Sequence, residues 1–154
     1  MKLISIVLGA FVAGMASTAM AQDTLLTVES ATGEQVEYTI DDLEALPQVE
    51  YVTMNPYIDS PSSFSGPLLR DLVEGVGEDE QLSLVAINDY SVEIPMGDAI
   101  NYDVIVATRL DGHHMSVREK GPLWVMYPFS DHPELNDSIY NARLIWQLDT
   151  IVTP

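Results

Sequence analysis

Residues 118–128 read Arg118-Glu119-Lys120-Gly121-Pro122-Leu123-Trp124-Val125-Met126-Tyr127-Pro128. Five apolar residues lie between two prolines, a pattern that predicts a short buried strand. The prolines limit strand pairing to the residues between them, because proline has no backbone N–H to donate. We expect this strand to carry Trp124 and Tyr127 toward a polar loop over residues 129–136.

A second stretch has the same design. Leu84-Val85-Ala86-Ile87 is an apolar run, and it is followed directly by Asn88-Asp89-Tyr90. Two buried strands that each end in polar and aromatic side chains can line a binding pocket. The two stretches together therefore predict where such a pocket lies.

The rest of the chain predicts many short strands and few helices. Alternating apolar and polar residues predict a hairpin over residues 24–39. Asp41 to Leu46 is expected to be a short helix, with Asp41 as its cap and Glu44 completing a capping box. Further strands are expected over residues 49–54, 82–87, 91–95, 103–110, 113–117 and 144–152. Strands and helices mixed in this way are typical of an α+β domain.

Two segments between these strands bear on the core and the pocket. Gly66-Pro67 is expected to start the best helix of the chain, which carries a leucine and valine stripe and ends at Gly75 or Gly77. Residues 55–65 are rich in Pro, Ser and Tyr and are expected to form a loop. This loop either covers the edge of the core or forms one wall of the pocket.

Composition narrows the classes of partner. The chain has 154 residues, a formal net charge of -18 and no cysteine. Disulfides and thiolate metal sites are therefore excluded. Nucleic acid is not an expected partner, because a strongly negative field repels phosphate. A solvated acidic surface is the simplest explanation of the charge.

Residues 1–21 have the features of a signal peptide. Lys2 is followed by an apolar run from Leu3 to Met15, and Ala19-Met20-Ala21 is a small-x-small cleavage site. We expect export to the periplasm and a single mature domain over residues 22–154. An uncleaved N-terminal anchor is the alternative.

Common catalytic and metal-binding patterns are missing from the sequence. The adjacent His113 and His114 would point to opposite faces of a strand, and His132 is distant from them. There is no G-x-S-x-G nucleophile elbow and no glycine-rich phosphate loop. The sequence thus offers no metal site and no nucleophile.

An ordered set of short motifs nevertheless resembles the molybdopterin-binding domain of the sulfite oxidase family, in its small single-domain bacterial branch. The resemblance covers roughly residues 24–153. It is carried by Ala86-Ile87-Asn88-Asp89-Tyr90, Ile94-Pro95, Asp111-Gly112, Arg118, Gly121-Pro122-Leu123-Trp124 and Tyr127-Pro128. It implies a sulfite-oxidase-type fold of layered mixed sheets with few short helices.

The chain departs from this family at the molybdenum ligand. The family binds molybdenum through a cysteine thiolate, and the equivalent region, about Val52 to Pro56, offers only Thr53, Met54 and Asn55. None of these supplies the thiolate. The resemblance therefore implies binding of a free reduced pterin rather than of molybdopterin.

The sequence suggests six residues for such a pterin site. Asp89 could accept hydrogen bonds from the donor edge of the pterin, and Asn88 or Arg118 could donate to its acceptor edge. Trp124, Tyr127 and Tyr90 could stack on its faces. Three of them have a structural alternative: Trp124 as a core residue, Asp89 as a residue that only shapes a turn, and Arg118 as the partner of a surface acid. Trp146 is expected to be core.

The functional hypothesis is a non-enzymatic periplasmic pterin-binding protein. By resemblance to that branch, it would act on the periplasmic region of a membrane-bound signalling partner, such as a cyclic-di-GMP enzyme or a sensor kinase. The first alternative is a molybdopterin-dependent oxidoreductase with a non-thiolate metal site. The second is an interaction module whose pocket is vestigial and empty.

Overall fold

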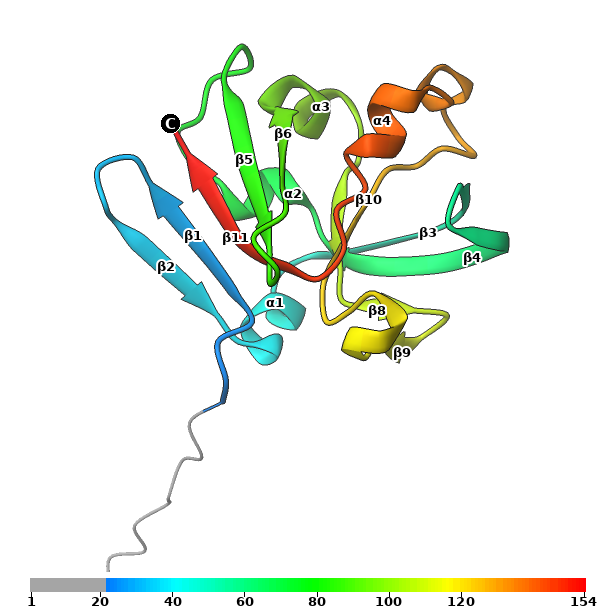
Figure 1. Cartoon of the computed structure of the whole chain (residues 1–154), viewed down its shortest axis with the longest axis horizontal. Helices are drawn as coiled ribbons and strands as arrows, with labels where there is room; N and C mark the ends of the chain where they lie inside the picture. The colour runs from blue at the N-terminus through cyan, green and yellow to red at the C-terminus, as the bar shows by residue number, and fades with distance from the viewer. Residues whose placement is uncertain (1–21) are drawn as a thin grey trace, which may run out of the picture.

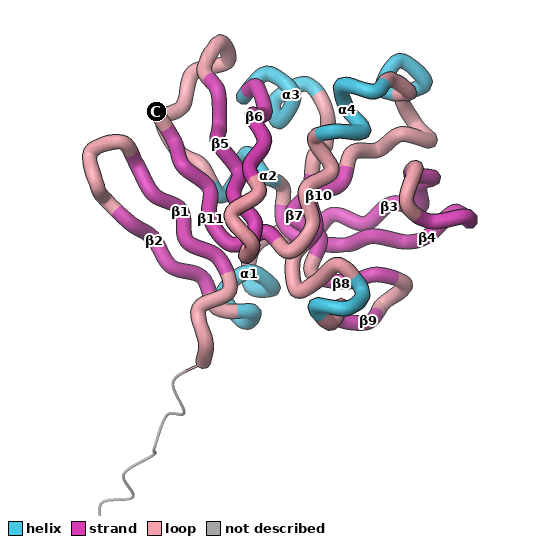
Figure 2. The backbone as a smooth tube through the Cα atoms, viewed as in Figure 1, coloured by secondary structure: helices cyan, strands magenta, loops and turns pink. Residues whose placement is uncertain are grey.

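The central apolar stretch forms strand β10 (Trp124–Met126), and all three of its residues are buried. The computed structural model describes residues 22–154, so the predicted signal peptide lies outside the described residues. β10 pairs antiparallel with β7 (Ile105–Ala107), which is also fully buried. Figure 2 shows this pair in the interior, between two larger sheets. The prediction of a short buried strand here is confirmed.

The larger of those sheets has five strands in the order β2-β1-β11-β5-β6. Only β1 and β11 run parallel, and every other neighbouring pair is antiparallel. Alternate residues of β5 are buried, which is the pattern of a strand with one face on the core. The strands are β1 (Leu26–Ser30), β2 (Gln35–Tyr38), β5 (Gln81–Ala86), β6 (Ser91–Pro95) and β11 (Leu148–Thr153).

The other sheet has four strands in the order β3-β4-β8-β9. Its long hairpin of β3 (Gln48–Asn55) and β4 (Ile58–Pro67) extends away from the first sheet (Figure 1). The short strands β8 (Arg109–Leu110) and β9 (His113–His114) complete it. The expected loop over residues 55–65 is thus mostly strand. Its prolines and serines concealed a period of two, in which alternate residues from Ser62 to Gly66 are buried.

Gly66 is the point where this hairpin contacts the central pair. A Cβ atom at Gly66 would collide with the backbone carbonyl oxygen of Val106 in β7. Only glycine permits such a close approach of two backbones. The residue therefore joins the hairpin to the buried strand pair.

In residues 22–154, four short α-helices connect the strands. The predicted helix from Gly66 to Gly75 is a single turn, because Gly66-Pro67 belongs to β4 and Leu68 bridges to Ile105. The first helix is capped by Thr39 and Asp42 rather than by Asp41 and Glu44. The helices are α1 (Ile40–Ala45), α2 (Leu69–Leu72), α3 (Met96–Asn101) and α4 (Ser138–Ala142). Two 3-10 helices, η1 (Val117–Glu119) and η2 (Pro133–Leu135), lie in the loops.

The last strand begins later than its sequence suggests. The apolar run from Leu144 predicts a strand over residues 144–152, but β11 starts at Leu148. Gln147 has a φ angle of 54°, which breaks the extended backbone just before the strand. Residues 143–147 therefore form no regular element, and three of them line a cavity. Within residues 22–154, no helix has the length and apolar character to cross a membrane.

Candidate functional site

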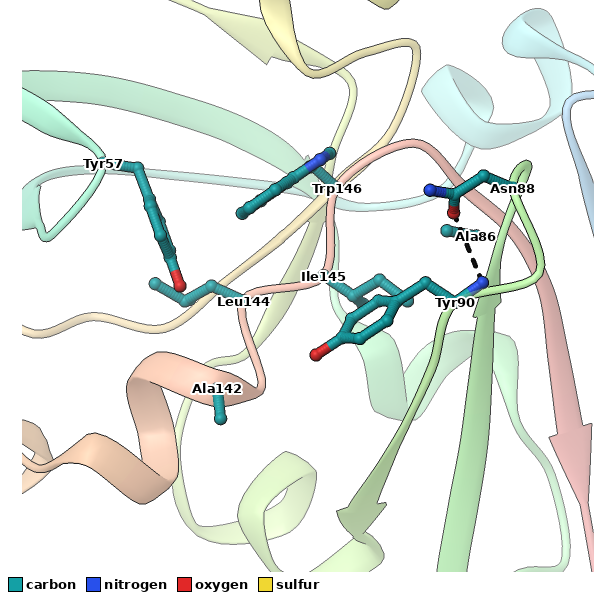
Figure 3. Close-up of a pocket in the computed structure, with 8 residues that line it drawn as sticks. All are labelled: Tyr57, Ala86, Asn88, Tyr90, Ala142, Leu144, Ile145 and Trp146. Carbon is teal, nitrogen blue, oxygen red and sulfur yellow. Dashed lines mark hydrogen bonds between the residues drawn. The ribbon is translucent and has the colours of Figure 1, made fainter.

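A cavity of about 340 Å³ opens where the β5–β6 turn, the β3–β4 turn and the segment after α4 meet. Figure 3 shows side chains from all three segments facing this cavity, which we call the aromatic pocket. Its size is at the lower end of the range for small-molecule sites. Its lining residues are Tyr57, Ala86, Asn88, Tyr90, Ala142, Leu144, Ile145 and Trp146, none of which is charged.

Two rings form one wall of the aromatic pocket. Tyr57 and Trp146 meet edge to face, with their ring centroids 4.9 Å apart. Trp124 lies behind them, 6.5 Å from the Tyr57 ring and 6.4 Å from the Trp146 ring. Its buried indole N–H donates to the backbone carbonyl of Leu144, 3.2 Å away. Trp124 thus supports the wall from the core.

The β5–β6 turn supplies the opposite side. Asp89 has a φ angle of 65°, so the chain reverses tightly between Asn88 and Tyr90. The Asn88 Oδ1 atom accepts a hydrogen bond from the Tyr90 N–H at 3.3 Å, which holds the turn (Figure 3). The Tyr90 ring is 57% exposed and points toward the segment that follows α4. The turn presents one amide and one aromatic ring to the pocket.

A polar network fixes the end of α4. Ala142, the last residue of this helix, lines the pocket. Arg143 Nη1 lies 2.6 Å from Asp98 Oδ2 in α3, and both side chains are mostly buried. The Tyr127 hydroxyl donates to the same carboxylate oxygen at 2.8 Å. Burial, with the Asp98 charge beside it, raises the pKa of Tyr127 well above its ordinary value. Tyr127 therefore remains a neutral donor that anchors this network.

The structure brings only two of the six predicted site residues into the pocket lining, Asn88 and Tyr90. Trp124 and Tyr127 have no exposed surface. The prediction that they stack on a ligand is therefore corrected. Both rings lie in the core, and the Trp124 indole N–H and the Tyr127 hydroxyl already donate hydrogen bonds within the protein.

The two predicted charged residues lie outside the lining. Asp89 is exposed at the tip of its turn, and Arg118 is exposed on η1. Asp89 has a left-handed backbone, which agrees with the alternative that this residue only shapes the turn. Neither side chain lines the aromatic pocket.

Sequence reasoning missed Trp146 as a residue of the pocket wall. Trp146 was expected to be core, but it is 36% exposed and lines the pocket. Its exposure follows from the left-handed backbone of the next residue, Gln147, which the sequence does not reveal. Lys120 was also missed: its Nζ atom lies 5.7 Å from the ring centroids of both Trp124 and Trp146.

The basic side chains of residues 22–154 are mostly committed to other contacts. Arg70 pairs with Asp103, Arg109 with Glu44, and Arg143 with Asp98. Lys120 lies against the two indoles. A phosphate group in the aromatic pocket would therefore find no bidentate arginine.

The described residues also offer no obvious metal ligands. No three His, Asp or Glu side chains converge within residues 22–154, and the whole chain lacks cysteine. In the region where the resemblance predicts the thiolate, about Val52 to Pro56, the Thr53 hydroxyl already donates to Met54 O and accepts from Ser130 N. The residues present do not fit a molybdenum ion held by a protein sulfur atom.

Comparison with known proteins supports the fold. No family model matches the chain, and no curated protein matches its sequence. Among solved structures, it is similar to the sulfane dehydrogenase SoxCD from Paracoccus pantotrophus, with a TM-score of 0.62 and 15% sequence identity. The match covers 86% of this chain but only 38% of that chain. The predicted α+β fold of the sulfite oxidase type is therefore confirmed.

Proposed function

We propose that this chain is a non-catalytic periplasmic protein that binds a free reduced pterin and regulates a membrane-bound signalling partner. The observation that supports this most is the aromatic pocket, in which three aromatic rings and one amide surround a cavity with no charged lining. A pterin is a flat, nearly neutral bicycle. It needs stacking surfaces and a hydrogen-bonding edge rather than counter-charges.

Asn88 is the residue proposed to orient the ring. A primary amide presents a donor and an acceptor side by side, and so does the ring edge of a pterin that carries the carbonyl and the adjacent N–H. Asn88 Oδ1 has a second lone pair beyond its bond to Tyr90 N, and its Nδ2 group has no partner in the described chain. The pair of hydrogen bonds would fix the ring while Trp146, Tyr57 and Tyr90 cover it.

A molybdenum-dependent oxidoreductase is the alternative function. It is disfavoured because the chain has no cysteine to supply the thiolate, and because no charged side chain lines the pocket to hold a phosphate tail. Protein purified from its native periplasm should contain far less than about one molybdenum per chain. Elemental analysis that finds stoichiometric molybdenum would support the enzyme instead.

The regulatory part of the proposal is supported by the surface around the pocket. Ile87, Tyr90 and Ile139 are each more than half exposed near the turn and on α4. A partner that contacts these residues would bind differently when a ligand fills the cavity beside them. Coupling of this kind needs only a ligand with different affinities for the free and the partner-bound protein.

The test is calorimetric titration of a reduced pterin into the protein over residues 22–154. We expect saturable binding in wild type and a loss of about tenfold in Asn88→Ala, because two hydrogen bonds are removed. Asn101→Ala, on the far end of α3, is the matched control and should bind as wild type. Absence of binding to any reduced pterin would refute the pterin proposal.

The partner is tested separately. The periplasmic region of a membrane signalling protein encoded next to this chain should bind it with an affinity that depends on the pterin. Equal affinity with and without a saturating pterin would remove the regulatory part and leave ligand binding intact.

A further inference from the structure

A second cavity, of about 470 Å³, lies directly beside the aromatic pocket. Three asparagines (Asn55, Asn136 and Asn141), Ser130 and Phe129 contribute to its lining, and we call it the asparagine pocket. The two linings come together at two points of the chain. Pro56 lines this one and Tyr57 the other, and Asn141 lines this one and Ala142 the other.

Tyr57 lines the aromatic pocket and is hydrogen-bonded to two residues that line the asparagine pocket, Asn55 and Asn141. Its hydroxyl donates to the backbone carbonyl of Asn141 at 3.3 Å, which ties the β3–β4 turn to α4. Tyr57 is 40% exposed, so its ring is not sealed in the core. A substituent that passes this ring would reach Pro56 and Asn141, which line the asparagine pocket.

Asn55 indicates that this second cavity binds something. The residue is 7% exposed, and its Oδ1 atom accepts a hydrogen bond from Tyr57 N at 2.9 Å. Its Nδ2 group is buried and has no hydrogen-bond partner within residues 22–154. A buried amide donor without a partner is costly and uncommon. An acceptor atom on a ligand would satisfy it.

The walls around Asn55 are held in place before any ligand arrives. Ser130 N donates to Thr53 Oγ1, and Met54 N donates to Ser130 Oγ, both at 3.1 Å. These two bonds join the end of β3 to the loop that follows β10. The polar groups of the asparagine pocket are therefore presented by a fixed backbone.

The chemistry of the lining selects a neutral group. No charged side chain lines the asparagine pocket, and the chain carries a net charge of -18. An anionic substituent would meet a repulsive field and no counter-charge. Amide side chains offer donors and acceptors together, which suits hydroxyl groups.

We infer that the asparagine pocket is a subsite for an uncharged, hydroxyl-bearing substituent on the heterocycle that the aromatic pocket holds. This inference rests on the proposed function and adds the class of ligand: a pterin with a neutral polyol side chain is preferred over an unsubstituted or an anionic pterin. The ring is bound by one cavity and the substituent by the other.

The test compares three ligands by calorimetry, each in its tetrahydro form: pterin, neopterin and 6-carboxypterin. Wild type should bind neopterin about tenfold more tightly than pterin, because the side chain adds hydrogen bonds to the asparagine amides. It should bind 6-carboxypterin no more tightly than pterin. Asn55→Ala and Asn136→Ala should each reduce the advantage of neopterin. Asn136→Ala, which has no bond to the aromatic pocket, should leave the affinity for pterin within about twofold.

Asn136 is exposed, so Asn136→Ala keeps the test valid if Asn55→Ala fails to fold. Asn88→Ala is the matched control, since it should weaken all three ligands by the same factor. Equal binding of pterin and neopterin to wild type, or an advantage that survives in the asparagine variants, overturns the subsite but not the proposed function. Tighter binding of 6-carboxypterin overturns the neutral class. Failure of all three to bind wild type overturns both proposals.

Discussion

Tyr57 and Trp146 lie edge to face with their ring centroids 4.9 Å apart, although one follows β3 and the other precedes β11. The contact joins the four-stranded sheet to the start of the last strand of the five-stranded sheet. It also makes a wall of the aromatic pocket from two segments that are remote in sequence. The pocket is thus a product of tertiary packing rather than of any one motif.

The first prediction concerns the two tryptophans. Trp146→Leu should weaken pterin binding by about tenfold, because it removes a stacking surface, and should change stability little. Trp124→Leu should lower the free energy of unfolding by roughly 3 kcal/mol, because Trp124 is fully buried. Calorimetry and urea unfolding of both variants separate the roles. A Trp146→Leu protein with wild-type affinity would remove this ring from the site.

The second prediction concerns the charged residues that the sequence had suggested. Arg118→Ala and Asp89→Gly should leave the affinity for a reduced pterin within about twofold of wild type, because neither residue lines the pocket. Glycine is chosen at position 89 because it adopts the 65° φ angle without strain. A tenfold loss in either folded variant would restore that residue to the site.

The third prediction concerns the ion pair that holds α4. Arg143→Met leaves the Asp98 carboxylate mostly buried without its cation, which should cost about 3 kcal/mol of stability. The double variant Asp98→Asn with Arg143→Met should recover part of that loss, since no unpaired charge remains. Urea unfolding of the wild type and the three variants measures the coupling. Additive effects of the two substitutions would show that the pair contributes no coupling.

The fourth prediction concerns acid stability. Hydrogen bonds from Arg109 and His114 lower the pKa of Glu44 below its ordinary value of 4.5. The stability that this pairing contributes is present above that ordinary pKa and is lost as the pH falls through the lowered, folded-state pKa. Wild type should therefore exceed Glu44→Gln in stability by about 1 kcal/mol near neutral pH, since the pair is partly exposed.

That difference should shrink toward zero in acid, below the lowered pKa. Urea unfolding across the acid range measures it, and Glu93→Gln, an exposed carboxylate on β6, is the control. A difference between wild type and Glu44→Gln that stays constant with pH would show that Glu44 acts through packing alone.

The fold class could be predicted from the sequence because the apolar pattern is clear in the strands that are completely buried. The apolar residues before Pro128 form the fully buried strand β10, as predicted. The run before Asn88 forms the end of β5, but only one face of that strand is buried and Ile87 lies exposed beyond it. The β3–β4 hairpin was missed because serine and proline conceal its alternation. Helix α2 was overestimated because Leu68 is drawn into a bridge with Ile105.

The site was harder to predict because the backbone conformation of neighbouring residues decides which of its side chains are exposed. Trp124 and Trp146 are both tryptophans in apolar runs, and nothing local distinguishes the buried ring from the half-exposed one. The difference follows from Gln147, whose positive φ angle delays β11. Asn55 similarly looks like an ordinary turn residue until its buried Nδ2 group is seen without a partner.

The contact between Trp124 and Trp146 also determines the fluorescence of the protein. The chain contains two tryptophans, and their ring centroids lie 6.4 Å apart at the wall of the aromatic pocket. All indole fluorescence of the protein therefore originates from this one place, with the Lys120 ammonium group beside both rings. When indole is excited selectively over tyrosine, the emission of the unlabelled protein is thus a local optical reporter of whatever enters the cavity.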